Sequence, residues 1–526
     1  MRDFHFPGRS AVFATNGLCA TSHPLAAQVA VQILQSGGNA VDAAIAGAVL
    51  LGLAEPQMCG LGGDCFVLLK PTGNQQVVAL NGSGRAPQGL NAAALRDKGQ
   101  TRIGTESIES VTMPGAVDAF CRLSDDWGRI GLAAALAPAI HYAREGIPVA
   151  PRVAFDWAED AARLTGCARD HYMLGGQPLR TGALFRAPKQ AEVLERIAAH
   201  GRAGFYDGDV ADDFIKSLNA MGGSHSANDL AQTKAAYTEP VSGAYLGHEL
   251  IEHPPNGQGA TAILMLNILA HFDLASLDPL GAPRAHLEAE AAKLAYDARN
   301  RFIADLDHTT GLDHMLSADT AARLAALIDP KRAMAFPPTA AGAVHRDTVY
   351  ITVVDRDLLA VSLIYSIYWG FGSGRASSKY GILFQNRGAG FTLEPGHPNE
   401  AAGGKRPMHT IIPGLVAREG RAIMPFGVMG GAYQPTGHAR LLTNLVNYGM
   451  DPQSAIDAPR CFSDDGQMMV ERGYSDSTRA KLADMGHDVK IPNEPLGGAQ
   501  AILIDHEAGI LQGASDPRKD GIALGY

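Results

Sequence analysis

Cysteine is scarce in this sequence, with six residues among 526 and no CxxC pair. No cysteine–histidine cluster has the spacing of zinc ligands, so the sequence predicts no metal site. We interpret the cysteines as free, buried thiols of a protein in a reducing compartment. They are Cys19, Cys59, Cys65, Cys121, Cys167 and Cys461.

The sequence also lacks an apolar run long enough to cross a bilayer. Its longest run, AAIAGAVLLGLA at residues 43–54, is much shorter than the roughly 20 residues of a membrane helix. The segment MRDFHFPGRSAVFATNG has no sustained apolar core behind a basic start, which a secretory signal would need. We therefore expect a cytoplasmic protein with no membrane partner, and a buried helix at 43–54.

Positive charge is not in excess, since the net charge is −10 and the pI is near 6.0. The basic residues are scattered, so we expect no nucleic-acid partner. No GK[ST] motif is present, and no GxGxxG lies between a strand and a helix, so no nucleotide cofactor is predicted. GFGSG at 370–374 superficially resembles the GxSxG elbow of serine hydrolases, but its serine is one position off.

Helical periodicity marks several segments before residue 330. Residues 24–36 have helical spacing and end at a Gly-Gly pair, and 254–269 is a glycine-rich loop that leads into a helix. Residues 286–302 predict an amphipathic helix with Ala292, Leu294 and Ala295 inward and its charges outward. Short strand-like runs follow later in the chain, which indicates a layered α+β protein.

The segment 329–347, DPKRAMAFPPTAAGAVHRD, separates the helical part of the chain from the part with short strand-like runs. It has no periodicity and contains three prolines, which is typical of an exposed connection. A boundary is therefore expected near residue 347.

A β-hairpin is predicted directly after this connection. Thr348 opens a run in which side chains alternate between two faces, and a second alternating run covers 361–368. If the turn is centred on Asp357, Thr348 lies directly opposite Ser366, with Cβ atoms about 5 Å apart. A register slip of one residue would destroy this pairing.

Two interpretations of Thr348 are consistent with this pattern. It can simply be a β-branched residue that starts a strand. Alternatively, it is a nucleophile: a threonine hydroxyl needs a base beside it, and cleavage of the chain before the threonine would free its own α-amine for that task. The exposed connection offers a place for the cut, and Ser366 could hold the hydroxyl or the amine.

Further blocks show a family resemblance over most of the chain. The sequence resembles the γ-glutamyltransferase family of N-terminal-nucleophile hydrolases, and the ordered set of blocks is specific although each block alone is weak. The resemblance implies a four-layer αββα sandwich, a nucleophile at Thr348, and subunits of 347 and 179 residues that cover 1–347 and 348–526. The blocks are GGNAVDAAIAGAVLLGLAEPQMCGLGGDCFVLL, TMPGAVDAF, FYDGDVADDF, EPVSGAYLGHELIEHPP, AEAAKLAYDARNRFIADLD, KRPMHTIIP and FGVMGGAYQPTGH.

The resemblance also implies roles for single residues. Arg85 falls where the family binds the substrate α-carboxylate, which suits a planar guanidinium. Gly430 and Gly431 match the glycines of the oxyanion hole, where backbone N–H groups approach a developing O⁻. Ser366 matches the hydroxyl residue that supports the nucleophile. The pair His409 and Thr410 falls where γ-glutamyl transferases carry two serines near the substrate carboxylate. Structural interpretations stay open for three of these features. Arg85 can be a surface arginine, the glycine pair an ordinary turn, and His409 a histidine whose hydrogen bonds are satisfied by the protein.

Three positions depart from the family pattern. Where γ-glutamyl transferases hold the substrate α-ammonium with asparagine, glutamine and aspartate, this chain has Tyr368, Arg387 and Gly390. The added guanidinium suits an anion or a carbonyl better than an ammonium group. The segment 392–404 is also shorter than the family's lid loop, which favours hydrolysis over transfer to an acceptor amine.

These residues leave three functions open. By family, the default is an autoprocessed amidohydrolase that acts on a γ-glutamyl amide such as glutathione. The departures favour an acyl group without an α-ammonium, as in oxamate amidohydrolase or glutaryl-cephalosporin acylase-like members. The third is an uncut, non-catalytic relative. For a processed chain, the expected partner is its own cleaved subunit, in an αβ heterodimer or an α₂β₂ assembly.

Overall fold

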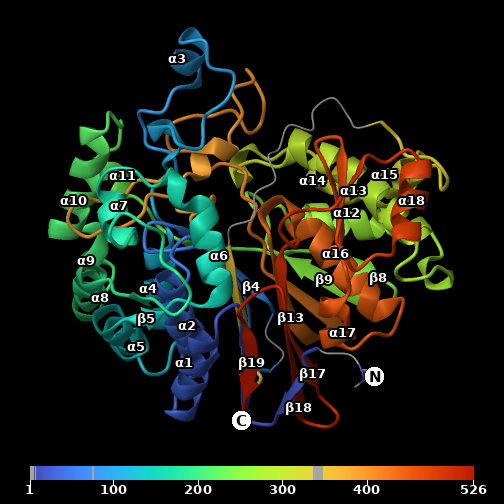
Figure 1. Cartoon of the computed structure of the whole chain (residues 1–526), viewed down its shortest axis with the longest axis horizontal. Coiled ribbons are helices and arrows are strands. Elements are labelled where there is room, and N and C mark those ends of the chain that lie inside the picture. Colours follow the sequence, from blue (N-terminus) through green and yellow to red (C-terminus); the bar gives the residue numbers. More distant parts are fainter. Residues whose placement is uncertain (1–4, 6–7, 74–75, 336–347) are drawn as a thin grey trace.

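Two antiparallel sheets stacked face to face form the centre of the molecule (Figure 1). The computed structural model describes residues 5, 8–73, 76–335 and 348–526. The first sheet has the order β1 (Val12–Ala14), β18 (Ile510–Ser515), β17 (Gly498–Asp505), β13 (Arg421–Met429), β12 (Gly414–Arg418), β9 (His248–Glu252) and β8 (Val241–Tyr245). The second has the order β19 (Ile522–Gly525), β2 (Gly17–Thr21), β10 (Val349–Asp355), β11 (Ala360–Ser366), β3 (Asp64–Lys70), β4 (Val78–Gly82) and β7 (Ala236–Thr238).

Helices cover the outer face of each sheet, so the predicted four-layer αββα architecture is confirmed. On one side lie α1 (Pro24–Gln35) and α2 (Ala40–Ala54); on the other lie α12 (Gly259–Leu269), α13 (Ala282–Phe302) and α16 (Gln434–Val446) (Figure 1). Every residue of α2 is buried, which explains why its sequence is almost entirely apolar. The helices predicted at 24–36 and 43–54 and the loop that leads into a helix at 254–269 are thus confirmed.

Strand β10 is buried on both faces because it lies inside this sandwich. Val349, Ile351 and Val353 pack toward the helical layer, whereas Tyr350 packs against the other sheet. Its neighbours between the sheets include Phe66 and Met429. The alternation of the sequence therefore positions the start of β10 at the interface of the two sheets.

The prediction for the charges of α13 is wrong. Ala292 and Ala295 are buried as expected, but Glu288, Glu290 and Lys293 are buried as well. The reason is that α13 packs on α12 on one side and on β14 (Cys461–Asp464), β15 (Gln467–Val470) and α18 (Asp476–Asp484) on another. Ion pairs between the buried groups, such as Lys293 with Glu290 at 2.7 Å, make this burial tolerable.

Strands from both sides of the predicted cleavage position share both sheets. β2 lies between β19 and β10, and β3 pairs with β11. Two subunits divided between 347 and 348 would therefore be intertwined rather than separate bodies. The first part of the predicted connection, 329–335, is described, whereas 336–347 lies outside the described residues.

All six cysteines are free thiols, five buried and Cys167 half-buried, which agrees with the prediction. Among the described helices, none combines the length and the apolar character needed to cross a membrane.

Candidate active site

Thr348 and Ser366 lie together at one end of the β10–β11 hairpin. The register pairs Val349 with Tyr365 and Tyr350 with Ile364, which is the pairing expected from a turn centred on Asp357. Both hydroxyl side chains are buried, and their oxygens are 3.5 Å apart. The predicted hairpin and its register are confirmed.

The Ser366 hydroxyl connects Thr348 to a third side chain. Its oxygen accepts the backbone N–H of Tyr368 at 2.9 Å and Nη2 of Arg387 at 3.1 Å. A cationic donor therefore lies one hydroxyl away from the candidate nucleophile.

Arg387 is a buried cation at the start of the short helix η5 (Arg387–Gly390). Its Nη1 donates to the Thr410 hydroxyl at 2.8 Å, and its guanidinium lies 4.0 Å from the centre of the Tyr368 ring. No carboxylate of the described chain forms an ion pair with it, and its Nε finds no acceptor there. Burial lowers the pKa of Arg387 to about 10, an effect that the negative charge of Asp64 opposes. The site thus holds a positive charge whose protein partners are mainly hydroxyls and a ring.

Gly430 and Gly431 form the turn between β13 and η6 (Gly431–Tyr433), which leads into α16. Gly430 has φ of 118°, and a Cβ there would lie 2.9 Å from Cα of Gly497, so this position requires glycine. In the described part of the chain, neither glycine N–H has an acceptor. Two backbone donors at a strand-to-helix turn are the arrangement that an oxyanion hole needs.

Gln258 was missed by the sequence reasoning. Its Nε2 donates to the carbonyl of Thr410 at 2.6 Å and to that of Gly431 at 3.0 Å, and its Oε1 accepts Nη1 of Arg299 at 2.8 Å. It therefore ties the glycine turn to the segment that faces Arg387. The only signal was its place in the glycine-rich segment before α12.

His409 is buried and engaged by the protein at both ring nitrogens. Nε2 lies 3.1 Å from Oδ2 of Asp64, and Nδ1 accepts the backbone N–H of Ile411 at 3.3 Å. Burial lowers the pKa of His409 to about 3, so the ring is neutral at ordinary pH. Its predicted contact with substrate remains a prediction. Asp64 was missed by the sequence reasoning, because nothing in GLGGDC indicates a partner 345 residues away.

Arg85 belongs to a more exposed group of charges. Its Nη1 donates to Oδ2 of Asp305 and to the carbonyl of Gly404, both at 2.9 Å, and its side chain is 40% exposed. Asp305 also accepts the backbone N–H of Arg406. The carboxylate-binding role of Arg85 remains a prediction, and any substrate would share this guanidinium with Asp305.

The short segment 392–404 is folded into a small lobe with α3 (Ala92–Asp97), which projects at the top of Figure 1. Phe391 and Leu393 pack against Leu95 and other apolar residues, and Arg96 forms an ion pair of 2.7 Å with Glu400. This packing explains how so short a segment keeps a defined position.

One group in the described chain has metal-like spacing: ligand atoms of the buried residues His286, Glu290 and His487 lie within 4.8 Å of one another. Nδ1 of His286 is 2.8 Å from Nε2 of His487, and Glu290 accepts the ammonium of Lys293 and the N–H of Met334. The hydrogen bonds of these groups are therefore made within the protein, and Lys293 supplies the positive charge beside Glu290. Through bonds to Asp329 and Met334, these groups fasten the segment 329–335 to α13.

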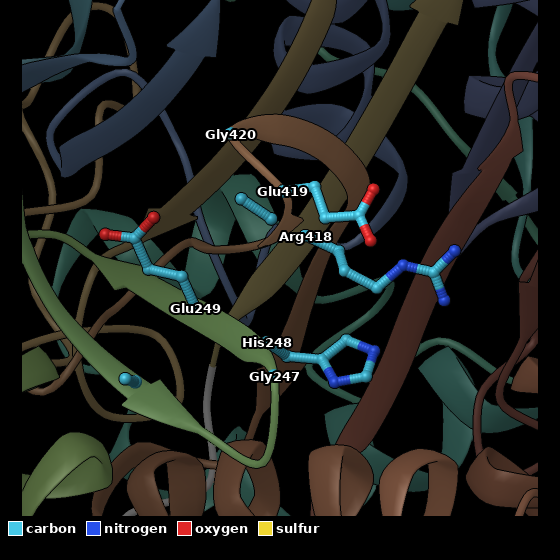
Figure 2. Close-up of a pocket in the computed structure, with 8 residues that line it drawn as sticks. Gly247, His248, Glu249, Arg418, Glu419 and Gly420 are labelled. Carbon is cyan, nitrogen blue, oxygen red and sulfur yellow. The ribbon is translucent and has the colours of Figure 1, made fainter.

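The pocket of Figure 2 is separate from the candidate nucleophile. It lies between the turns of the β8–β9 and β12–β13 hairpins, where His248, Glu249, Arg418 and Glu419 line it (Figure 2). None of the predicted catalytic residues is among its lining residues.

The chain is similar to known proteins over nearly its whole length. The gamma-glutamyltranspeptidase family matches residues 26–526. The chain is 35% identical to the glutathione hydrolase-like YwrD proenzyme of Bacillus subtilis, over 98% of this chain and 99% of that protein. It is 34% identical to the oxamate amidohydrolase proenzyme of Klebsiella pneumoniae, over 98% and 99% of the two chains.

A solved structure is similar over the whole chain. Cephalosporin acylase from Bacillus halodurans superposes with a TM-score of 0.93 at 36% identity, covering 100% of this chain and 99% of that one. The chain therefore belongs to the gamma-glutamyltranspeptidase family and is a hydrolase of that family.

Proposed function

We propose that this hydrolase is an autoprocessed amidohydrolase with Thr348 as its nucleophile. Cleavage of the peptide bond before Thr348 would produce the subunits 1–347 and 348–526 and free the α-amine of the threonine. The proposal is supported by the position of Thr348 directly before β10 and beside Ser366. It is also supported by the relatives, whose names include the word proenzyme.

The catalytic cycle has two halves. The α-amine of Thr348 takes the proton of its own hydroxyl, and Oγ1 attacks the substrate amide carbon. The negative oxygen that forms is held by the N–H groups of Gly430 and Gly431. The C–N bond breaks, the leaving amine takes the proton, and an acyl ester of Thr348 remains. Water then adds to the ester, releases a carboxylic acid and restores the threonine. Ser366 keeps the hydroxyl in place throughout.

The acyl group carries a carboxylate and no α-ammonium. The single observation that supports this is Arg387, a buried guanidinium with no carboxylate partner in the described chain. An ammonium group about 4 Å from a guanidinium would be repelled by roughly 4 kcal/mol at an effective dielectric constant of about 20. A carboxylate in the same place is attracted to the guanidinium instead. A glutaryl-type or oxamate-type acyl group fits this requirement better than a γ-glutamyl group.

A γ-glutamyl amide such as glutathione is the second candidate. Arg85 is present at the position where the family binds the α-carboxylate, and one relative is named glutathione hydrolase-like. Arg387 stands against this substrate because of its charge.

Water is the proposed acceptor, since the segment 392–404 is short and packed into the α3 lobe. The cleaved chain would act as an αβ heterodimer or as α₂β₂. Six free cysteines support a reducing compartment such as the cytoplasm.

Three amides with one leaving group test the substrate class: glutaryl-, γ-glutamyl- and pentanoyl-p-nitroanilide, with ammonia release from oxamate as a fourth assay. We expect kcat/KM for the glutaryl substrate to exceed that for the other two anilides at least about tenfold, as one charge-assisted hydrogen bond implies. Arg387→Met should remove this preference, and Arg387→Lys should retain part of it. A preference for γ-glutamyl in the native enzyme would establish the second candidate instead.

A further inference from the structure

Asp64 and His409 form a buried pair beside Ser366 and Thr410, the two residues that bond Arg387. Asp64 begins β3 and lies opposite Ser366 in the β3–β11 ladder. Its Oδ1 accepts the N–H of Gly84 and Nε2 of Gln385, both at 2.8 Å, and its Oδ2 faces His409. All of these partners are donors, so the hydrogen bonds require an ionised carboxylate.

The hydrogen bonds of His409 also define its tautomer. Because Nδ1 accepts the N–H of Ile411, the ring proton lies on Nε2 and is donated to Asp64. The backbone N–H of His409 donates to the carbonyl of Asn256 at 2.8 Å. The backbone on both sides of Thr410 is therefore held by His409, through its ring at Ile411 and through its own N–H at Asn256.

Thr410 and Ser366 are the two hydroxyls that hold the Arg387 fork. Nη1 donates to Thr410 at 2.8 Å and Nη2 to Ser366 at 3.1 Å. Thr410 follows His409 in the chain, and Ser366 is the cross-strand partner of Asp64. Both ends of the guanidinium are thus positioned by residues adjacent to the Asp64–His409 pair.

We propose that Asp64 and His409 are positioning residues that determine the selectivity of this enzyme for a carboxylate-bearing acyl group. They act by holding Thr410, and through it the Arg387 guanidinium, at the place where the substrate carboxylate binds. The negative charge of Asp64 additionally favours the cationic form of the buried guanidinium. This inference rests on the proposed function, because it deepens the carboxylate role of Arg387.

The test compares selectivity rather than activity alone. For each variant, kcat/KM is measured with glutaryl- and pentanoyl-p-nitroanilide, which share a leaving group and differ in the carboxylate. We expect His409→Phe to lower the glutaryl/pentanoyl ratio about tenfold, mainly through KM for the glutaryl substrate. Asp64→Asn and Thr410→Val, which are nearly isosteric, should lower the ratio in the same direction.

A matched control lies on α16, where His438 bonds to residues of the other sheet. His438 is also buried, donates from Nδ1 to Glu252 at 2.6 Å and accepts the N–H of Val428 at Nε2, but it does not contact Arg387. His438→Phe therefore removes an equivalent pair and should leave the ratio unchanged while lowering the melting temperature. A merely structural role of His409 would give the two variants the same result.

The double variant Asp64→Asn/His409→Phe completes the test. If the two residues act as one unit, its loss of selectivity equals that of the larger single effect rather than their product. An unchanged ratio in His409→Phe and Asp64→Asn, or independent effects that multiply, overturns the inference. If the native enzyme itself shows no glutaryl preference, the proposed substrate class fails instead, so the two failures are distinguishable.

Discussion

Thr348 and Ser366 face each other across the first pair of strands after the predicted cleavage position, with hydroxyl oxygens 3.5 Å apart. The same Ser366 oxygen accepts a donor of Arg387. The candidate nucleophile and the candidate substrate-binding cation are therefore linked through one hydroxyl. We therefore expect chain cleavage and turnover both to be sensitive to substitution of Ser366.

Thr348→Ala should remain one uncut chain and lose amidase activity, because both processes need the hydroxyl. Intact-mass measurement and N-terminal sequencing would detect this, since the native protein should give a fragment that begins Thr-Val-Tyr. Thr348→Ser retains a hydroxyl and serves as the control, with slow but detectable cleavage. Normal cleavage of Thr348→Ala would show that the nucleophile lies elsewhere.

Arg85→Ala should raise KM for carboxylate-bearing substrates about tenfold with little change in kcat, which is the expected effect of losing one charge-assisted hydrogen bond. Asp305→Asn is the informative control, because it removes the ion pair of 2.9 Å but keeps the arginine. If Arg85 only anchors Asp305, both variants lower stability alike and leave KM unchanged.

Gly430→Ala should lower kcat by about 10²–10³ and leave KM nearly unchanged, because a shift of this turn would displace an oxyanion donor. The added Cβ would meet Gly497 at 2.9 Å, and the backbone φ of 118° is unsuited to alanine. Gly449→Ala is matched for positive φ, at 60°, but has open space around it and should cost stability only. Equal kinetics for the two variants would remove the glycine turn from the mechanism.

Glu55→Gln should stabilise the protein more at pH 8 than at pH 5. Burial raises the pKa of Glu55 to about 7, although Ser22 donates a hydrogen bond to it. The stability that such a group contributes is present at low pH and is lost as pH rises through the folded-state pKa. The neutral glutamine avoids this loss, which is on the order of 2–3 kcal/mol.

The measurement is the melting temperature of the native protein and of Glu55→Gln at the two pH values. Glu419→Gln, which changes an exposed glutamate, serves as the control. A difference in melting temperature that does not grow between pH 5 and pH 8 would contradict the raised pKa.

Much of this site could be predicted from local pattern. The alternation around a turn at Asp357 was sufficient to pair Thr348 with Ser366, because strand register follows from period and turn position. Likewise, an all-apolar segment predicted the buried helix α2. Such features depend on neighbours within about 20 residues.

The features that were missed depend on distant neighbours. Nothing near Glu288 indicates that Arg440 will meet it, so the charges of α13 were expected to face solvent. Asp64 and Gln258 became recognisable only when their partners at 409, 410 and 431 were located. For Gln258 the available signal was its place in a glycine-rich segment, but the hydrogen-bond partners of both residues are set by tertiary packing.

The intertwining of the sheets has a consequence for the lifetime of the enzyme. Because strands from both chain halves surround Thr348, a reactive centre built on this residue would exist only after the complete precursor had folded, and cleavage would act as a checkpoint against incomplete chains. Once cut, a denatured molecule would have to reassemble from two polypeptides. That reaction depends on protein concentration, whereas folding of the single-chain precursor does not. The durability of the mature enzyme would then be governed by its rate of unfolding rather than by an equilibrium.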